Sequence, residues 1–93
     1  MVFVNVRQTT ASYEAWRPFF DKDEPRRRAA GATGVNQVFR DVDNPNTVTV
    51  VLEWNDTEHA RQFMNDPALR EVMQKAGVIG APAVLAIATC ADA

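Results

Sequence analysis

The sequence has little of the chemistry that marks several protein classes. It contains one cysteine, Cys90, so no intramolecular disulfide can form, and a reducing compartment fits this usage. It contains one histidine, His59, and no histidine, cysteine or carboxylate cluster at metal-ligand spacing. We therefore expect neither a disulfide framework nor a metal centre.

Neither sign of charge dominates. The chain has 10 basic and 12 acidic residues, a formal net charge of −2, whereas non-specific nucleic-acid binding needs a basic surface. With 46% hydrophobic and 24% charged residues, the composition is that of a globular protein and excludes a disordered chain. We expect no nucleic-acid partner and a single domain over residues 1–93.

Long hydrophobic runs are missing too. The longest uncharged stretch, Ala76–Ala91, has 16 residues including two glycines and a proline, and a membrane-spanning helix needs about 20 apolar residues. The apolar start Met1–Val6 lacks the basic residues of a signal peptide. Gly31 and Gly34 follow a predicted helix instead of opening one, so they form no phosphate-binding loop. We expect a cytoplasmic protein that makes no membrane contact.

The order of the hydrophobic periods predicts the architecture. Strand-like runs occur at Met1–Gln8, Val35–Val42, Thr47–Trp54 and Pro82–Cys90. Helical periods occur at Ser12–Ala30 and Asp56–Ala76. Strand, helix, strand, strand, helix, strand is the ferredoxin-like βαββαβ order, an α+β fold with a four-stranded antiparallel sheet.

Prolines predict breaks in both helical regions. Ser12 is a candidate N-cap, and Pro18 and Pro25 inside the first region predict a kink or two consecutive helices. In the second region, Asp66 followed by Pro67 is typical of an N-cap and first helical position, so this region is split in two.

The first strand has two chemically different faces. Alternation places Val2, Val4 and Val6 on one face and Phe3, Asn5 and Arg7 on the other. The strand Thr47–Trp54 is expected in the interior of the sheet, because one face is apolar and Val51 adds an apolar side chain to the other. The turn 43–46, Asp-Asn-Pro-Asn, joins it to the preceding strand.

The last strand predicts an assembly. In the ferredoxin-like order it lies at a sheet edge, and Ala83–Ala88 is apolar on both faces without a charge. An uncovered edge of this kind invites aggregation, so natural proteins cover or pair it. We expect a homodimer through the sheet faces and the last strand; the alternative is a terminal segment that folds back over the strand.

Several short motifs resemble small bacterial proteins of the dimeric α+β barrel superfamily. They are Tyr13-Glu14-Ala15-Trp16, Arg27-Arg28-Ala29-Ala30-Gly31-Ala32-Thr33-Gly34, Phe39-Arg40-Asp41 with Asp43-Asn44-Pro45-Asn46, and Leu52-Glu53-Trp54. The superfamily includes antibiotic-biosynthesis-monooxygenase-like proteins and relatives labelled cyclases. The resemblance covers about Val2 to Ala88.

The resemblance implies a homodimer whose two sheets form a shared barrel, with a small-molecule pocket between each sheet and its helices. Members include cofactor-free monooxygenases, aromatic polyketide cyclases, lactone isomerases and haem-binding enzymes. No single catalytic motif unites them, so no catalytic residue is transferred to this chain, and no tightly bound cofactor is expected.

Asn5 and Arg7 are candidate catalytic residues. They share a strand face with Phe3, and polar groups on a buried face need partners. An asparagine amide can polarise a carbonyl or stabilise an oxyanion, and Asn5 could do so near Trp16 and Trp54 if the three converge. The alternative is that both polar residues bond across a dimer interface.

His59 is a further acid–base candidate, because histidine titrates near neutrality. The alternatives are a solvated histidine on a helix surface and a haem ligand, for which a lone histidine is weak support. The run Arg26-Arg27-Arg28 follows acidic residues and suits a solvated helix end; anion binding is its alternative.

Aromatic residues are concentrated for so small a domain. The candidate pocket residues are Phe3, Tyr13, Trp16, Phe20, Phe39 and Trp54. Such a stripe packs a core, or it forms a flat apolar pocket for an aromatic or polycyclic ligand.

The sequence leads to two hypotheses of function. One is a small-molecule-binding protein of the monooxygenase-like or cyclase-like group, acting as a cofactor-free enzyme on an aromatic or polyketide-like compound. The other is a non-catalytic ligand-binding or stress-response module.

Overall fold

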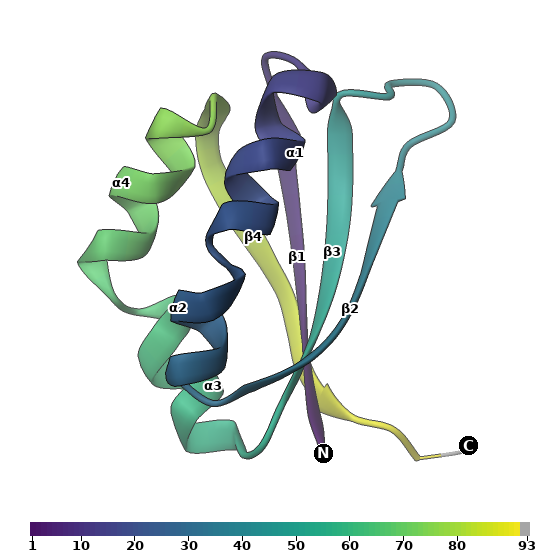
Figure 1. Cartoon of the computed structure of the whole chain (residues 1–93). Helices are drawn as coiled ribbons and strands as arrows, with labels where there is room; N and C mark the ends of the chain where they lie inside the picture. The colour runs from purple at the N-terminus through teal and green to yellow at the C-terminus, as the bar shows by residue number, and fades with distance from the viewer. Residues whose placement is uncertain (92–93) are drawn as a thin grey trace.

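A computed structural model describes residues 1–91 and divides them into four strands and four helices. The elements are β1 (Val2–Thr10), α1 (Tyr13–Lys22), α2 (Glu24–Ala29), β2 (Ala32–Arg40), β3 (Thr47–Trp54), α3 (Thr57–Met64), α4 (Pro67–Lys75) and β4 (Val78–Thr89). The predicted ferredoxin-like α+β order is confirmed, and both helical regions are divided as expected (Figure 1).

The strands form one antiparallel sheet in the order β2-β3-β1-β4. The interior strands are β1 and β3, which pair from Val2 opposite Trp54 to Thr9 opposite Thr47. The edge position of β4 and the interior position of β3 were both predicted from the sequence, and both are confirmed.

The predicted bounds of three strands were wrong, because pairing with neighbouring strands overrides local breaking residues. β1 continues to Thr10, which pairs with Val78, and β4 accordingly begins before Pro82. β2 spans Ala32–Arg40, shifted from the expected 35–42, with Gly34 at a φ of 92° inside an irregular start.

The expected helix starts are confirmed. The Ser12 side chain accepts a hydrogen bond from Ala15 N at 3.4 Å, and the Asp66 side chain accepts one from Ala68 N at 2.9 Å. Asp23 separates α1 from α2. The break turns α2 while keeping it on the same side of the sheet as α1 (Figure 1).

The helices cover one face of the sheet, and the core lies between them (Figure 1). Val4 and Val6 of β1 and Val48 and Val50 of β3 are buried on this face. We call the other sheet face the outer face; it carries Phe3, Asn5 and Arg7 of β1 together with Phe39 of β2. Among residues 1–91, no helix is long and apolar enough to cross a membrane.

Candidate functional site

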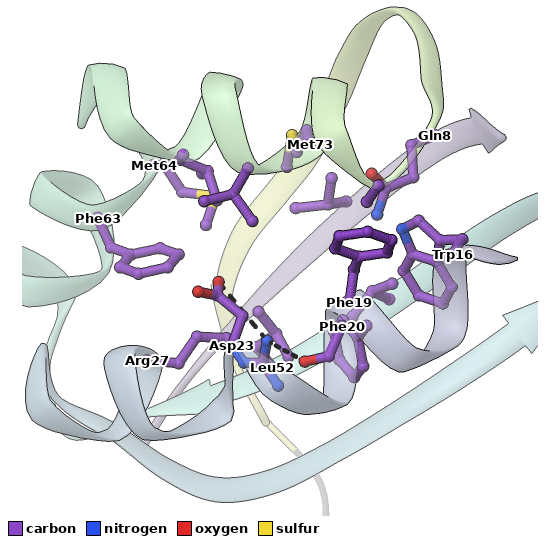
Figure 2. A pocket seen from close by; sticks show the side chains of 15 residues that line it. Gln8, Trp16, Phe19, Phe20, Asp23, Arg27, Leu52, Phe63, Met64 and Met73 are labelled. Atoms are coloured by element: carbon purple, nitrogen blue, oxygen red, sulfur yellow. Dashed lines mark hydrogen bonds and ion pairs between the residues drawn. The ribbon is translucent and has the colours of Figure 1, made fainter.

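A cavity opens between the sheet and the helices (Figure 2). Its walls come from both interior strands, all four helices and the residue between α1 and α2. They are Val6, Gln8, Val50, Leu52, Trp16, Phe19, Phe20, Asp23, Arg27, Phe63, Met64, Leu69, Val72, Met73 and Ala76. Twelve of these fifteen residues are apolar, so the cavity suits an apolar or aromatic molecule.

The free space is about 500 Å³ counted out to the open mouth, of which about 50 Å³ admits the centre of a water-sized sphere. The inner part is therefore smaller than the cavity of about 150 Å³ that encloses one benzene ring. A larger ligand has to use the mouth, where Phe19 is 42% exposed.

Gln8 is the polar residue on the sheet side of the cavity. Its side chain is 7% exposed, and its Oε1 atom has no hydrogen-bond partner among the described residues. Figure 2 shows the amide directed toward the Trp16 indole and the interior of the pocket. A buried carbonyl oxygen without a partner costs about 1–3 kcal/mol of folding free energy. It is thus a ready acceptor for a ligand O–H or N–H.

Arg27 and Asp23 supply the charged end of the cavity. Arg27 is 4% exposed and donates one hydrogen bond, from Nη1 to the Phe20 carbonyl at 2.9 Å. Its guanidinium carbon lies 4.0 Å from the centre of the Phe20 ring, a cation–π contact. Burial lowers the pKa of Arg27, and the charge of Asp23 partly opposes this effect.

Helical spacing explains why these side chains meet. Trp16, Phe20, Asp23 and Arg27 are separated by four, three and four residues, so one stripe continues from α1 into α2. Trp16 stacks on Phe20 with ring centres 5.0 Å apart. The stripe faces the sheet and lines the helical wall of the cavity (Figure 2).

The cavity brings together Trp16 and Phe20 of the six aromatic residues predicted for a pocket. The other four lie elsewhere. Tyr13 packs beside Trp16 at 5.9 Å but points to Arg40, which lies 3.9 Å from its ring centre. Trp54 is fully buried in the core, with its ring 4.9 Å from Phe63.

Phe3 and Phe39 lie on the outer face, because strand alternation directs them away from the helices. They do not line the cavity.

The three predicted catalytic candidates also lie outside the cavity. Asn5 and Arg7 are on the outer face, and Arg7 forms an ion pair with Asp41 that raises the pKa of its guanidinium. Asn5 therefore does not converge with Trp16. His59 is exposed on α3, where its ring bonds the Asp56 carboxylate at 2.6 Å.

Gln8, Asp23 and Arg27 were missed by the sequence interpretation, although two signals indicated them. Gln8 continues the alternation of Val2, Val4 and Val6, and so faces the helices. The solvated surface expected for the arginine run was wrong for Arg27, because Arg27 falls on the helical stripe.

Among residues 1–91, no group of three histidine, cysteine or carboxylate residues is placed to hold a metal ion. The ionisable side chains that line the cavity are Asp23 and Arg27. Chemically, this arrangement can bind an apolar ring, accept a hydrogen bond at Gln8 and stabilise negative charge at Arg27.

Sequence comparison does not identify the chain, since neither a protein-family model nor a curated protein matches it. Solved structures do match. One antibiotic biosynthesis monooxygenase is 14% identical with a TM-score of 0.67, over 99% of this chain and 100% of the other. The chain has the antibiotic biosynthesis monooxygenase fold.

Two further structures share this monooxygenase fold with the chain. SnoaB, a cofactor-independent oxygenase from Streptomyces nogalater, is 14% identical with a TM-score of 0.65, over 97% of this chain and 94% of SnoaB. Rv0793 from Mycobacterium tuberculosis is 16% identical with a TM-score of 0.63, over 98% of each chain. The superfamily resemblance noted in the sequence is thus confirmed at the level of fold.

Proposed function

We propose that this protein binds a small aromatic or polyketide-like molecule in the cavity between its sheet and its helices. The observation that carries the proposal is the unpartnered Gln8 Oε1 inside an otherwise apolar cavity. A ligand hydroxyl offsets the desolvation of that oxygen, and the aromatic walls provide the contact area.

A filled cavity tests the proposal. Val72→Phe adds a ring to the α4 wall, and we expect it to abolish binding of para-propylphenol measured by isothermal titration calorimetry. The matched control is Val42→Phe, since Val42 is 95% exposed and does not line the cavity. Equal binding by both variants, or no binding by the wild-type protein, contradicts the proposal.

Cofactor-free oxygenation is the second candidate function. The fold neighbour SnoaB is a cofactor-independent oxygenase, and Gln8 and Arg27 are suited to hold a substrate and its developing negative charge. In such a reaction an anthrone methylene and O2 give a quinone carbonyl and water. The competing function is non-catalytic ligand binding.

Oxygen uptake with anthrone separates these two functions and locates the reaction. Turnover that falls at least about tenfold in Gln8→Met but not in Asn5→Ala supports catalysis in the cavity. Turnover that falls in Asn5→Ala but not in Gln8→Met would place the reaction on the outer face, where Asn5 is a candidate catalytic residue. Binding without oxygen uptake supports the non-catalytic function.

We also propose that two copies associate through the outer face and β4. The residues that support this are exposed and apolar: Phe39 on the outer face, and Ile79, Val84 and Leu85 on the edge strand. Monomers rarely leave a long uncharged edge strand open to water.

A further inference from the structure

The buried charge at one end of the cavity is only partly compensated. Asp23 accepts two hydrogen bonds from Arg26, at 2.8 Å from Nε and 3.0 Å from Nη2. Its contact with Arg27 is longer, at 3.9 Å. One carboxylate thus serves two guanidinium groups and is engaged mainly by the more exposed one.

The other nearby carboxylates, Glu24 and Asp21, favour the charged form of Arg27 only through space, without a hydrogen bond to it. Glu24 lies 3.6 Å from Arg28, and the contact is exposed to solvent. Among the described residues, Arg27 donates its one hydrogen bond to a neutral carbonyl. A buried cation with a weakly engaged counter-charge is unfavourable, and an anionic group placed against it is correspondingly stabilised.

Gln8 and Arg27 occupy opposite ends of the cavity, with Phe19 and Phe20 between them (Figure 2). One end therefore accepts a hydrogen bond, and the other end offers N–H donors with a positive charge. The walls between the ends are aromatic and aliphatic. These features together select a ligand with different polar groups at its two ends.

We propose that the ligand is a hydroxylated aromatic carboxylic acid whose carboxylate contacts Arg27 and whose hydroxyl donates to Gln8. This inference rests on the proposed binding function and adds the chemical class of the ligand. Arg27 presents a forked, permanently charged donor set that matches a carboxylate, and Gln8 Oε1 is an acceptor that a ligand hydroxyl satisfies.

Three single-ring probes separate the contributions of the two ends. Para-hydroxycinnamate carries both groups, cinnamate only the carboxylate, and para-propylphenol only the hydroxyl. By calorimetry at neutral pH, we expect para-hydroxycinnamate to bind at least about tenfold more tightly than either of the other two.

Substitutions at Arg27 and Gln8 show which residue binds which end of the ligand. Arg27→Met should weaken both carboxylates about tenfold and leave para-propylphenol within about twofold, and Arg27→Lys should restore part of the loss. Gln8→Met should weaken the two hydroxyl compounds and spare cinnamate. Arg28→Met is the matched control, because Arg28 is exposed and lies outside the cavity walls.

The outcomes distinguish this inference from the function on which it rests. If para-propylphenol binds in the cavity but the carboxylates gain nothing and Arg27→Met changes nothing, the ligand class is wrong and the binding function stands. If none of the three probes binds the wild-type protein, both fail. Thermal unfolding of each variant identifies any that does not fold, and Arg27→Lys then carries the test.

Discussion

At the scale of single residues, Gln8 lowers the stability of the fold and favours ligand binding. Its side chain occupies a position on β1 where Val4 and Val6 point to the same core, and its Oε1 atom has no partner there. The oxygen destabilises the empty protein and becomes useful when a hydroxyl reaches it.

Gln8→Met should therefore raise the free energy of unfolding by about 1 kcal/mol while weakening para-propylphenol at least about tenfold. Urea unfolding and calorimetry measure the two effects on the same samples. Gln62→Met, an exposed change of the same type, should alter neither. A less stable Gln8→Met protein with unchanged binding would mean that Gln8 serves the fold alone.

Phe63 and Phe19 differ in burial, although both line the cavity. Phe63 is 4% exposed and packs against Trp54, with Arg26 4.7 Å from its ring centre. Phe63→Ala should lower the free energy of unfolding by about 3–5 kcal/mol, and Phe19→Ala by much less, since Phe19 stays partly in water. Similar losses in urea unfolding would contradict the assigned core.

Single residues show both what the sequence predicted and what it did not. Alternation placed Val2, Val4 and Val6 on one face, and the same rule extended by one step would have added Gln8. Arg27 was harder to recognise, because three consecutive arginines after acidic residues resemble a solvated helix end. The stripe from Trp16 shows its burial only once the turn at Asp23 is known.

At the scale of elements, the junction between α2 and β2 depends on Gly31. Its φ is 120°, and an added Cβ would lie 3.0 Å from the His59 Cβ on α3. Gly80 in β4 also has a positive φ, of 71°, but nothing lies within 4 Å of an added Cβ. Both positions have a positive φ, but only Gly31 lacks room for an added Cβ.

Gly80→Ala should cost about 1 kcal/mol of unfolding free energy from backbone conformation, and Gly31→Ala should cost more, because α3 also has to move. Differential scanning calorimetry of both variants checks the order. A Gly31→Ala protein as stable as Gly80→Ala would show that α3 moves away from the added Cβ without a cost in stability.

The start of α3 predicts a dependence on pH. The His59 backbone N–H, 2.8 Å from Asp56, and then the His59 ring lower the pKa of the Asp56 carboxyl from its ordinary value of 3.8. A depressed folded-state pKa stabilises the fold above the unfolded value, and this contribution is lost as pH falls through the folded one.

Wild type should thus exceed Asp56→Asn in unfolding free energy above about pH 5, and the difference should shrink on acidification below about pH 4. Urea unfolding at both values measures it. A difference independent of pH would mean that the charge of the Asp56 carboxylate does not stabilise this helix start.

At the scale of the whole molecule, the fold was predictable because each local pattern agreed with one topology. The turn at 43–46 joins two adjacent strands, and the uncharged last strand lies at the edge. The cavity was not predictable from residue type, because Phe3 on the outer face and Trp54 in the core are aromatic like Trp16, which lines the cavity. Their positions depend on strand register and on which face the helices cover.

Association of two copies should double the molar mass measured in solution. We expect light scattering at micromolar concentration to give twice the 10.3 kDa of one chain. Leu85→Lys, on the exposed edge strand, should give the single-chain mass. Val42→Lys, in the exposed turn, should remain a dimer. A wild-type monomer would contradict the role given to β4.

The central claim is that a ligand sits between the sheet and the helices, against Gln8 and Trp16. A titration of ¹⁵N-labelled protein with para-propylphenol, followed by two-dimensional NMR, tests it most directly. We expect the Trp16 indole N–H and the Gln8 side-chain amide to shift together, with the Asn5 amide unchanged. Shifts confined to Asn5 and its neighbours on the outer face would contradict the account.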